Sequence, residues 1–187
     1  MSSRRGGGCL LVLPGMPAAG VQGADRIPVR IWAAVLADAE VRRRYYGQVW
    51  PGRRHWWWLG AVDGSGHGSI RAQGRQFSAQ TLGWQLVNGL VPPAGDGDLV
   101  IRHACDNASC QRPACLMSGT RAENAADYQA RRWRADSPLA DVRGARGRAV
   151  AVRDAIRTAL RTGADPEQAA RQALAAGIPA GQQTLPW

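Results

Sequence analysis

Three cysteines at regular intervals constrain this chain more than any other feature. Cys105, Cys110 and Cys115 lie between a histidine, His103, and a carboxamide, Asn124, in the pattern H-x-C-x4-C-x4-C-x8-N. The loop has few apolar side chains, so it has little with which to fold itself. Thiolates suit zinc, which they bind at about 2.3 Å in four-coordinate sites. The spacing therefore predicts a loop folded around one zinc ion, with the histidine before it and the carboxamide after it.

The loop supplies three ligands, so a fourth has to come from elsewhere. The chain has three histidines, His55, His67 and His103, and spacing alone leaves all of them open. With a further cysteine, Cys9, two disulfides are conceivable, but a tight cluster without a clear export signal is more typical of a metal site. Bound zinc contributes on the order of 10 kcal/mol to such a loop. It would hold the strand carrying His103 against the helix carrying Asn124.

The excess of positive charge predicts a polyanionic partner. The chain has 24 basic residues, all arginine, against 14 acidic residues, for a formal net charge of +10. A GC-rich coding bias explains arginine in place of lysine, but it does not explain the excess of charge. We therefore expect a nucleic-acid partner. No segment reaches the ~18 apolar residues of a membrane span, so we expect no membrane partner and a cytoplasmic location.

Composition and periodicity predict an α+β fold in four parts. Residues 1–25 are glycine-rich and aperiodic, and we expect a disordered leader. Residues 26–135 would form the main domain, 136–147 a linker, and 148–187 a C-terminal helical hairpin with a tail. Apolar residues at helical spacing predict one N-terminal helix over 27–44.

Residues 55–77 are typical of a small β-sheet. WWWLGAV is rich in strand formers, DGSGHG is a glycine-punctuated turn, and SIRAQ and QGRQF are strands joined by a tight turn. Alternation predicts that Trp56 and Trp58 point inward and Trp57 points to the other face. A short helix is expected over 79–88.

The segment after the cysteine loop carries a clear helix start. Thr120 and Glu123 form a T-x-x-E capping box, which predicts a helix over 121–134. Four side chains would share one face of this helix: Asn124, Asp127, Tyr128 and Arg131.

Two further helices are predicted at 148–161 and 166–176. Asp165 is a suitable N-cap, and Pro166 suits the first helical position. The order of helix, turn and helix loosely resembles a DNA-targeting module, but the second helix is alanine-rich and has few base-reading side chains. We expect the hairpin to pack on the main domain or to form the contact of a homodimer.

The region from about 56 to 132 resembles the HNH, or His-Me finger (ββα-metal), endonucleases with a zinc-binding loop, found among homing and phage-type nucleases. The matching segments are HWWWLGAVDGSGHG, WQLVNG, HACDNASCQRPAC and GTRAENAAD. The resemblance implies a ββα-metal core that hydrolyses phosphodiester bonds of double-stranded DNA. In that family a cysteine usually stands at the position of His55, and a histidine at that of Cys115. The resemblance therefore implies the zinc ligands His55, Cys105, Cys110 and Cys115.

The same resemblance implies a reaction centre. His103 would be the general base that activates water, a role suited to a neutral imidazole. Asn124 would bind one catalytic Mg²⁺ through its amide oxygen, and the ion would stabilise the departing oxygen. Zn²⁺ would then be structural and Mg²⁺ catalytic.

Family members of this kind enter a DNA groove with a β-hairpin or sheet. Arg71, Gln73 and Arg75 alternate along the strands, which would place them on one face, and both residue types read base edges. Arg131 and Arg132, at the end of the capped helix, would hold phosphates. A solvated sheet face and compensation of the helix dipole explain the same residues equally well.

One departure from the family leaves a second function open. Relatives often carry Ala-His-Arg at the start of the short helix, where this chain has Ala79-Gln80-Thr81. Loss of that histidine and arginine would weaken cleavage unless nearby arginines such as Arg71 and Arg102 substitute for them. The alternative is a DNA-binding protein of the same fold with weakened cleavage. A third reading, a zinc-stapled protein-interaction module, agrees less well with the net charge.

Overall fold

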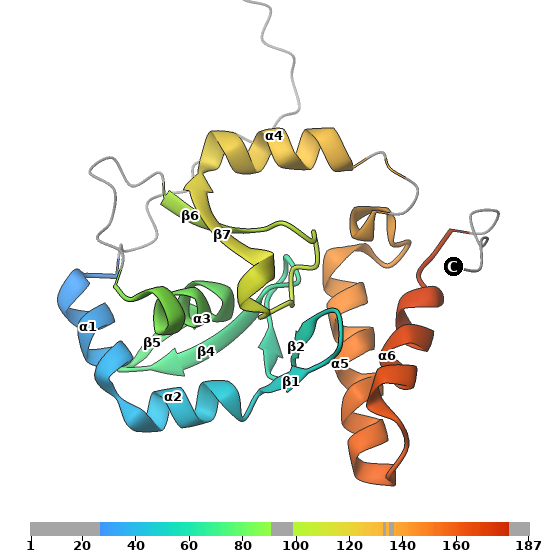
Figure 1. The fold of residues 1–187 in the computed structure, drawn as a ribbon, viewed down its shortest axis with the longest axis horizontal. Helices are drawn as coiled ribbons and strands as arrows, with labels where there is room; N and C mark the ends of the chain where they lie inside the picture. Colours follow the sequence, from blue (N-terminus) through green and yellow to red (C-terminus); the bar gives the residue numbers. More distant parts are fainter. Residues whose placement is uncertain (1–26, 91–98, 133, 135–136, 180–187) are drawn as a thin grey trace, which may run out of the picture.

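Helices and short antiparallel strands make up the computed structural model (Figure 1). The structure describes residues 27–90, 99–132, 134 and 137–179. Within these ranges it has six α-helices and seven strands, which agrees with the predicted α+β class. The leader predicted at 1–25 lies outside the described residues, as does the end of the C-terminal tail.

The strands are short and do not merge into one sheet. They pair antiparallel as β1-β2, β3-β4-β5 and β6-β7. The strands are β1 (Val49–Pro51), β2 (Trp56–Trp58), β3 (Ala61–Val62), β4 (Gly68–Ala72), β5 (Arg75–Ser78), β6 (Leu99–His103) and β7 (Leu116–Thr120). The helices are α1 (Val29–Ala37), α2 (Ala39–Tyr46), α3 (Ala79–Asn88), α4 (Arg121–Arg131), α5 (Gly144–Thr162) and α6 (Pro166–Ala175).

The single helix predicted over 27–44 is two helices, and the prediction was wrong at Asp38. This residue has extended backbone (ψ 108°) between α1 and α2. Its carboxylate accepts hydrogen bonds from the backbone N–H groups of Glu40 and Val41 at 2.9 and 3.2 Å. That is the geometry of an N-cap, so Asp38 starts a new helix where the apolar periodicity suggested a continuous one.

The main hydrophobic core lies between the α1–α2 pair, α3 and the β4–β5 hairpin. Trp58, Phe77 and Leu82 are its largest fully buried side chains. The Tyr45 ring packs on Trp58 with ring centroids 5.5 Å apart. The Tyr45 hydroxyl donates a hydrogen bond to Gln111 Oε1 at 2.9 Å. This core therefore supports the cysteine loop directly.

A second, smaller core joins β2 to the C-terminal hairpin. Trp57 and Trp58 belong to different cores, as strand alternation predicts. Both are buried, whereas Trp56 is only partly buried. The prediction of which tryptophans lie inside was therefore partly wrong. The hairpin packs on the main domain, as expected, and a dimer contact stays a prediction. The buried members of this core are Trp57, Val152, Ile156 and Ala170.

The segment predicted as a linker, 136–147, overlaps the first helix of the C-terminal hairpin. α5 begins at Gly144, so the linker ends before residue 147. The buried carboxylate of Asp141 forms ion pairs with Arg143 at 2.7 Å and Arg148 at 3.2 Å. These pairs fix the start of the hairpin.

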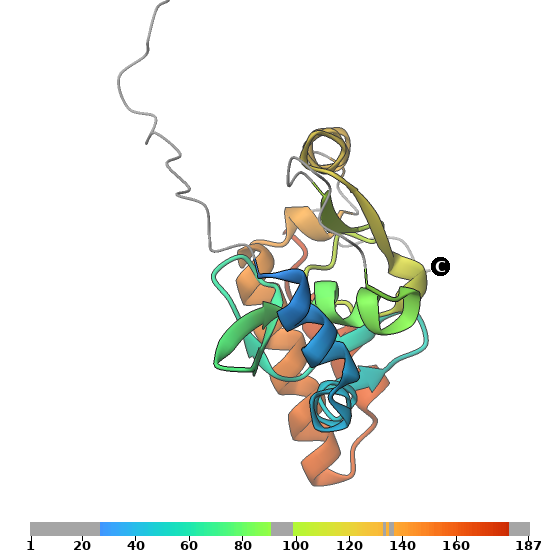
Figure 2. The ribbon, with the colours of Figure 1, turned by 90° about the vertical axis from the view of Figure 1, so that its left-hand side faces the viewer.

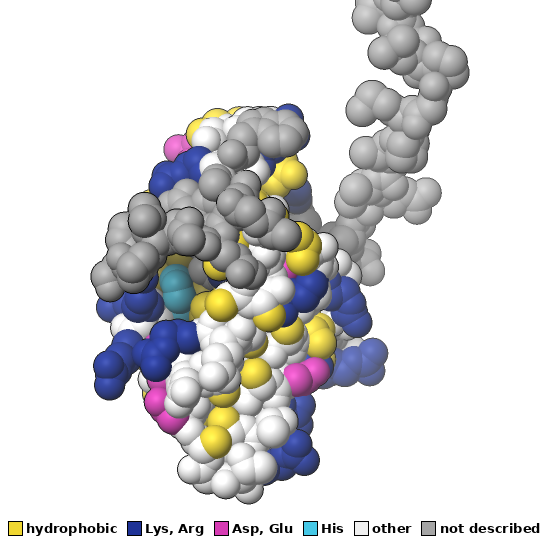
Figure 3. Space-filling view, turned by 90° about the vertical axis from the view of Figure 1, so that its right-hand side faces the viewer, with side chains coloured by type: hydrophobic (Ala, Val, Ile, Leu, Met, Phe, Trp, Pro, Cys, Tyr) yellow, Lys and Arg dark blue, Asp and Glu magenta, His cyan; other side chains and the backbone are white. Residues whose placement is uncertain are grey.

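Figure 3 shows the hairpin side of the molecule, where arginine side chains gather along the edges of a largely uncharged face.

The β4–β5 hairpin corrects the predicted DNA-reading face. Gln73 and Gly74 form its two-residue turn, with φ of 47° and 69°, so strand alternation stops before Gln73. Arg71 lies opposite Gln76, whereas Arg75 lies opposite the next residue of β4. Directly opposed residues share a face. Arg71 and Arg75 therefore lie on opposite faces of the hairpin, and the prediction that Arg71, Gln73 and Arg75 share one face was wrong.

β6, β7 and α4 form the layer that carries the predicted reaction centre. β6 and β7 pair antiparallel with His103 opposite Leu116, and α4 lies on their outer side, seen end-on in Figure 2. The predicted capping box is present. Thr120 Oγ1 accepts from the Glu123 N–H at 3.1 Å, and the Glu123 carboxylate accepts from the Thr120 N–H at 2.7 Å. α4 ends at Arg131, before its predicted end. Among the helices described, none is both long and apolar enough to cross a membrane.

Candidate metal centre and the adjoining cavity

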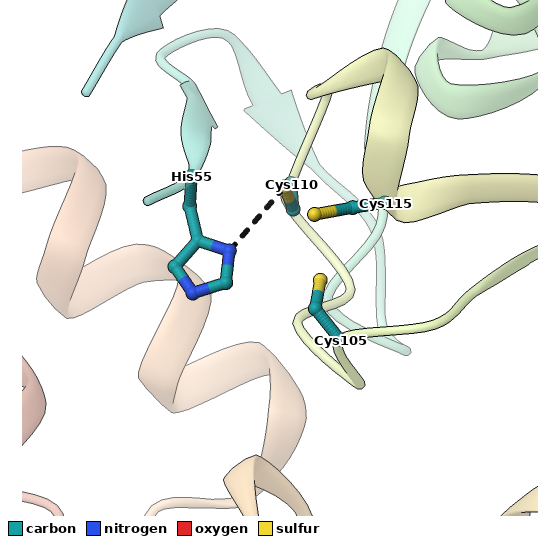
Figure 4. A group of neighbouring side chains, drawn as sticks. All are labelled: His55, Cys105, Cys110 and Cys115. Carbon is teal, nitrogen blue, oxygen red and sulfur yellow. Dashed lines mark hydrogen bonds between the residues drawn. The ribbon is translucent and has the colours of Figure 1, made fainter. Parts of the chain in front are cut away.

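The four predicted zinc ligands converge from two parts of the chain (Figure 4). Their ligand atoms all lie within 4.8 Å of one another, and Cys110 Sγ is 3.7 Å from His55 Nδ1. In a tetrahedral site with bonds of about 2.3 Å, sulfur ligands lie roughly 3.8 Å apart. The group therefore has nearly the size that zinc requires, and it can hold such an ion. Its members are His55, Cys105, Cys110 and Cys115.

The fourth member of this group is His55, and neither His67 nor His103 belongs to it. His55 immediately precedes β2, and the cysteine loop is bonded to that strand. Cys110 forms an isolated β-bridge with Trp57. Because the loop backbone runs beside β2, the residue at the start of the strand faces the sulfur atoms.

The three thiols cannot all ionise easily without a cation. A hydrogen bond from Cys110, helped by one from His55, lowers the pKa of Cys105 to about 3 despite its burial. The hydrogen bond to Cys105, together with burial and the neighbouring negative charge, raises the pKa of Cys110. Burial and the charge on Cys105 raise the pKa of Cys115. One thiolate is thus stabilised and further ones are opposed, which is the imbalance that a bound cation removes.

His103 is buried at the end of β6, with 8% of its surface exposed. Its Nε2 lies 2.9 Å from the carbonyl oxygen of Cys110. A carbonyl only accepts hydrogen bonds, so Nε2 carries the hydrogen and Nδ1 of the neutral ring carries the lone pair. Burial lowers the pKa of His103 to about 4. The ring is therefore neutral at pH 7, and Nδ1 is its basic nitrogen.

A cavity of about 390 Å³ connects His103 with α4. The predicted base, His103, and the predicted amide, Asn124, both line it. All four residues expected on one face of the capped helix also line it, which confirms that expectation. Asn124 is exposed to solvent, so its amide is open to a ligand. The residues from α4 are Asn124, Asp127, Tyr128 and Arg131.

Two arginines of the cavity are held by carboxylates. Arg102 lies 2.6 Å from Asp127, and Arg131 lies 3.1 Å from Asp127 and 3.2 Å from Asp106. The charge of Arg131 is therefore compensated within the protein. The guanidinium of Arg132 lies 5.8 Å from the centre of a tyrosine ring on the same helix. Phosphate contacts from Arg131 and Arg132 stay predictions.

A second histidine, His67, lines the cavity, whereas the sequence suggested it only as a possible zinc ligand. His67 lies 5.7 Å from His103 between ring centroids. The turn before it is held by Asp63 Oδ1, which accepts from the N–H groups of Ser65 and His67 at 2.8 and 3.0 Å. Burial lowers the pKa of His67. The Asp-x-Ser-x-His spacing was the available signal, since such an Asx turn fixes the residue that follows it.

Gln80 occupies the wall beside His67. It is 8% exposed, it lines the cavity, and its Oε1 has no hydrogen-bond partner within the part of the chain that the structure describes. This is the position where the family resemblance implies a histidine. The departure noted in the sequence therefore lies inside the cavity.

No protein-family model, no curated protein and no solved structure matches this chain.

Proposed function

We propose that this protein is a DNA endonuclease of the HNH type, in which His103 is the general base beside a zinc-stabilised loop. The observation that carries the proposal is that His103 and Asn124 line one cavity, next to a separate group that can hold zinc. The order of β6, cysteine loop, β7 and α4 supports the ββα-metal arrangement that the resemblance implies.

His103 would accept a proton from the attacking water. Its hydrogen bond to the Cys110 carbonyl oxygen holds the tautomer in which Nδ1 has the lone pair. The pKa of about 4 makes it a weak base in the free protein. A phosphodiester anion bound beside it would raise that pKa, because a nearby negative charge favours the protonated ring.

Asn124 would hold the divalent ion through its amide oxygen. The ion supplies positive charge at the phosphate and at the departing oxygen. Mg²⁺ prefers oxygen ligands, and Asn124 offers one from the exposed side of the cavity. The carboxylate of Asp127 is already paired with two arginines, which leaves the amide as the oxygen ligand that fits best on α4.

Zinc in this proposal is structural. Its ligands would tie the start of β2 to the loop that fixes His103, so the ion would hold the base in place. The formal charge of +10 supports double-stranded DNA as the partner. Arg71, Gln73 and Arg75 are exposed, so they remain candidate DNA contacts, although from different faces of the hairpin.

A second candidate function is DNA binding with weakened cleavage. Gln80 favours it, because a neutral amide stands in the cavity where relatives often carry a histidine. An amide neither accepts a proton from water nor carries charge at pH 7. The protein would then bind DNA in the same way but cut it slowly or not at all.

Plasmid cleavage in Mg²⁺ tests the proposal. We expect His103→Ala and Asn124→Ala each to reduce the cleavage rate by at least about 10²-fold. Asn88→Ala, which removes an exposed amide from α3 outside the cavity, is the matched control and should cut like the wild type. Salt-sensitive DNA binding without cleavage would instead support the second function. A wild-type protein that neither cuts nor binds DNA would refute both.

A further inference from the structure

We infer that His67 Nε2 and Gln80 Oε1 bind the divalent ion of this cavity, so that the site prefers a transition ion such as Co²⁺ over Mg²⁺. The inference rests on the proposed function in taking the cavity as the reaction site. It assigns a role to two side chains that the proposed reaction does not otherwise use.

The tautomer of His67 is fixed by its neighbours. Ser65 Oγ lies 2.8 Å from Asp63 Oδ1 and 2.8 Å from His67 Nδ1. Burial opposes ionisation of Asp63, but hydrogen bonds from Ser65 and His67 outweigh it and lower the pKa of Asp63. A carboxylate only accepts, so the Ser65 hydroxyl donates to Asp63, and its oxygen must accept from His67 Nδ1. The neutral His67 ring therefore has its lone pair on Nε2.

This arrangement is the one that supports a metal-binding histidine. Metal-bound imidazoles usually donate their other ring N–H to a fixed acceptor, which sets the tautomer and the ring orientation. Here Asp63 and Ser65 provide that acceptor. Because Nδ1 is engaged in this way, Nε2 is the nitrogen left for a ligand in the cavity that the ring lines.

Gln80 adds a second ligand atom on the same wall. Ser69 pairs with Ser78 at one end of the β4–β5 ladder, and His67 and Gln80 each follow two residues beyond this pair. Gly68, next to His67, approaches so closely that an added Cβ would lie 2.9 Å from the Ala79 Cβ. The buried Oε1 of Gln80 lacks a hydrogen-bond partner among the described residues. Leaving such an atom unpaired is costly, and a cation would satisfy it.

The donor atoms determine which ion fits. Imidazole suits transition ions such as Ni²⁺ and Zn²⁺, whereas Mg²⁺ prefers oxygen. Both ligand groups are neutral, and the acidic groups that line the cavity, Asp106 and Asp127, are paired with Arg102 and Arg131. An ion bound here would keep most of its positive charge for the phosphate. His103 keeps its Nδ1 for the proton, because it needs no place among these ligands.

Metal titration of the zinc-loaded full chain tests this without a cleavage assay. Calorimetry with Co²⁺ alone should show one site per chain beyond zinc, at least about tenfold tighter than the Mg²⁺ site. Co²⁺ precedes zinc in the affinity order, so it should leave zinc in the thiolate group. Weak visible absorption would indicate nitrogen and oxygen ligands, whereas intense sulfur bands would indicate entry into the cysteine group and would overturn the assignment.

Three variants locate the ligands. His67→Gln should weaken Co²⁺ binding at least about tenfold and change Mg²⁺ binding little. Ser65→Ala, which removes the fixed acceptor, should weaken Co²⁺ binding by roughly tenfold. Gln80→Leu should weaken binding of both ions. The control is Gln85→Leu, a buried glutamine of the same helix outside the cavity lining, which should bind both ions like the wild type.

Unchanged Co²⁺ affinity in His67→Gln, with one zinc still bound per chain, would overturn the inference. If His67→Gln loses zinc, Ser65→Ala is used in its place, and unchanged Co²⁺ affinity in Ser65→Ala would overturn the inference. If cleavage depends on His103 but Co²⁺ affinity does not depend on His67, the proposed function stands and only the inference is refuted. If Co²⁺ binds through His67 but no divalent ion supports cleavage, the inference stands and the proposed function is refuted.

Discussion

Replacement of His55 tests the metal centre most directly. A structural zinc site contributes on the order of 10 kcal/mol, so one of four ligands accounts for about 2.5 kcal/mol, or roughly 10²-fold in zinc affinity. His55→Ala also removes a ring that lies 5.1 Å from the Trp57 ring. We therefore expect His55→Ala to bind zinc about 10²-fold more weakly. His55→Cys should retain zinc, because a thiolate replaces the imidazole.

The assay is competition for zinc with a coloured chelator, together with the melting temperature. His67→Ala is the matched variant for the thiolate site, since His67 lies in the cavity and not in the metal group, and the one zinc ion held tightly by that group should stay bound as in the wild type. The zinc affinity of the wild type and of each variant should fall as the pH is lowered, because protons compete with zinc for thiolate and imidazole. If His55→Ala held zinc as tightly as the wild type, the ligand set would be wrong. Zinc loss in His67→Ala alone would move the fourth ligand to that residue.

Three further changes probe the fold and the cavity. Trp57→Ala should destabilise the protein by about 3–5 kcal/mol in urea unfolding, because Trp57 fills the core beneath the hairpin; a loss below about 1 kcal/mol would contradict that packing. Gly83→Ala places a methyl group against the Tyr45 hydroxyl that bonds Gln111 and should cost about 1–3 kcal/mol in thermal unfolding; an unchanged melting temperature would show that the contact is loose. Gln80→Glu adds a charged ligand to the cavity and should tighten Co²⁺ binding in calorimetry, whereas weaker binding would place Gln80 outside the ion's reach.

Features set by local chemistry were predicted well from the sequence. The capping box, the limits of α3 and the three-cysteine loop each depend on residues a few positions apart. The shared face of α4 was also correct, because helical periodicity fixes it once the N-cap is known. His55 was found through the resemblance, since spacing alone left His67 and His103 equally open.

The errors arose where one residue changes the phase of a pattern. The apolar residues on both sides of Asp38 recur with the period of one long helix, yet the Asp38 carboxylate caps a new helix. Gln73 fits the alternation of a strand, yet it adopts positive φ and begins the turn. Because side chains in a strand alternate with a period of two, this shift moves Arg75 to the face opposite Arg71.

Other features depend on segments far apart in the chain. Alternation indicates that Trp57 and Trp58 face opposite ways, but it cannot indicate that a hairpin more than eighty residues later covers the second face. His67 enters the cavity only because its turn lies against α3 and β6 in space. A sequence pattern predicts on which face of its helix or strand a side chain lies. It does not predict which distant residues that side chain will contact.

Cys110 links the metal centre to the proposed base, and this explains why the two occur together. Its sulfur belongs to the group that can hold zinc, while its carbonyl oxygen accepts the hydrogen bond from His103 Nε2. A ligand that fixes Cys110 therefore also fixes the acceptor that sets the His103 tautomer. The backbone beside Cys110 is also held to β2, because the Gln111 N–H donates to Trp56 O at 2.6 Å and the Trp58 N–H donates to Ser109 O at 3.0 Å. A zinc ion bound to the Cys110 sulfur would therefore strengthen the anchor of this carbonyl, and with it the His103 tautomer, without touching the imidazole.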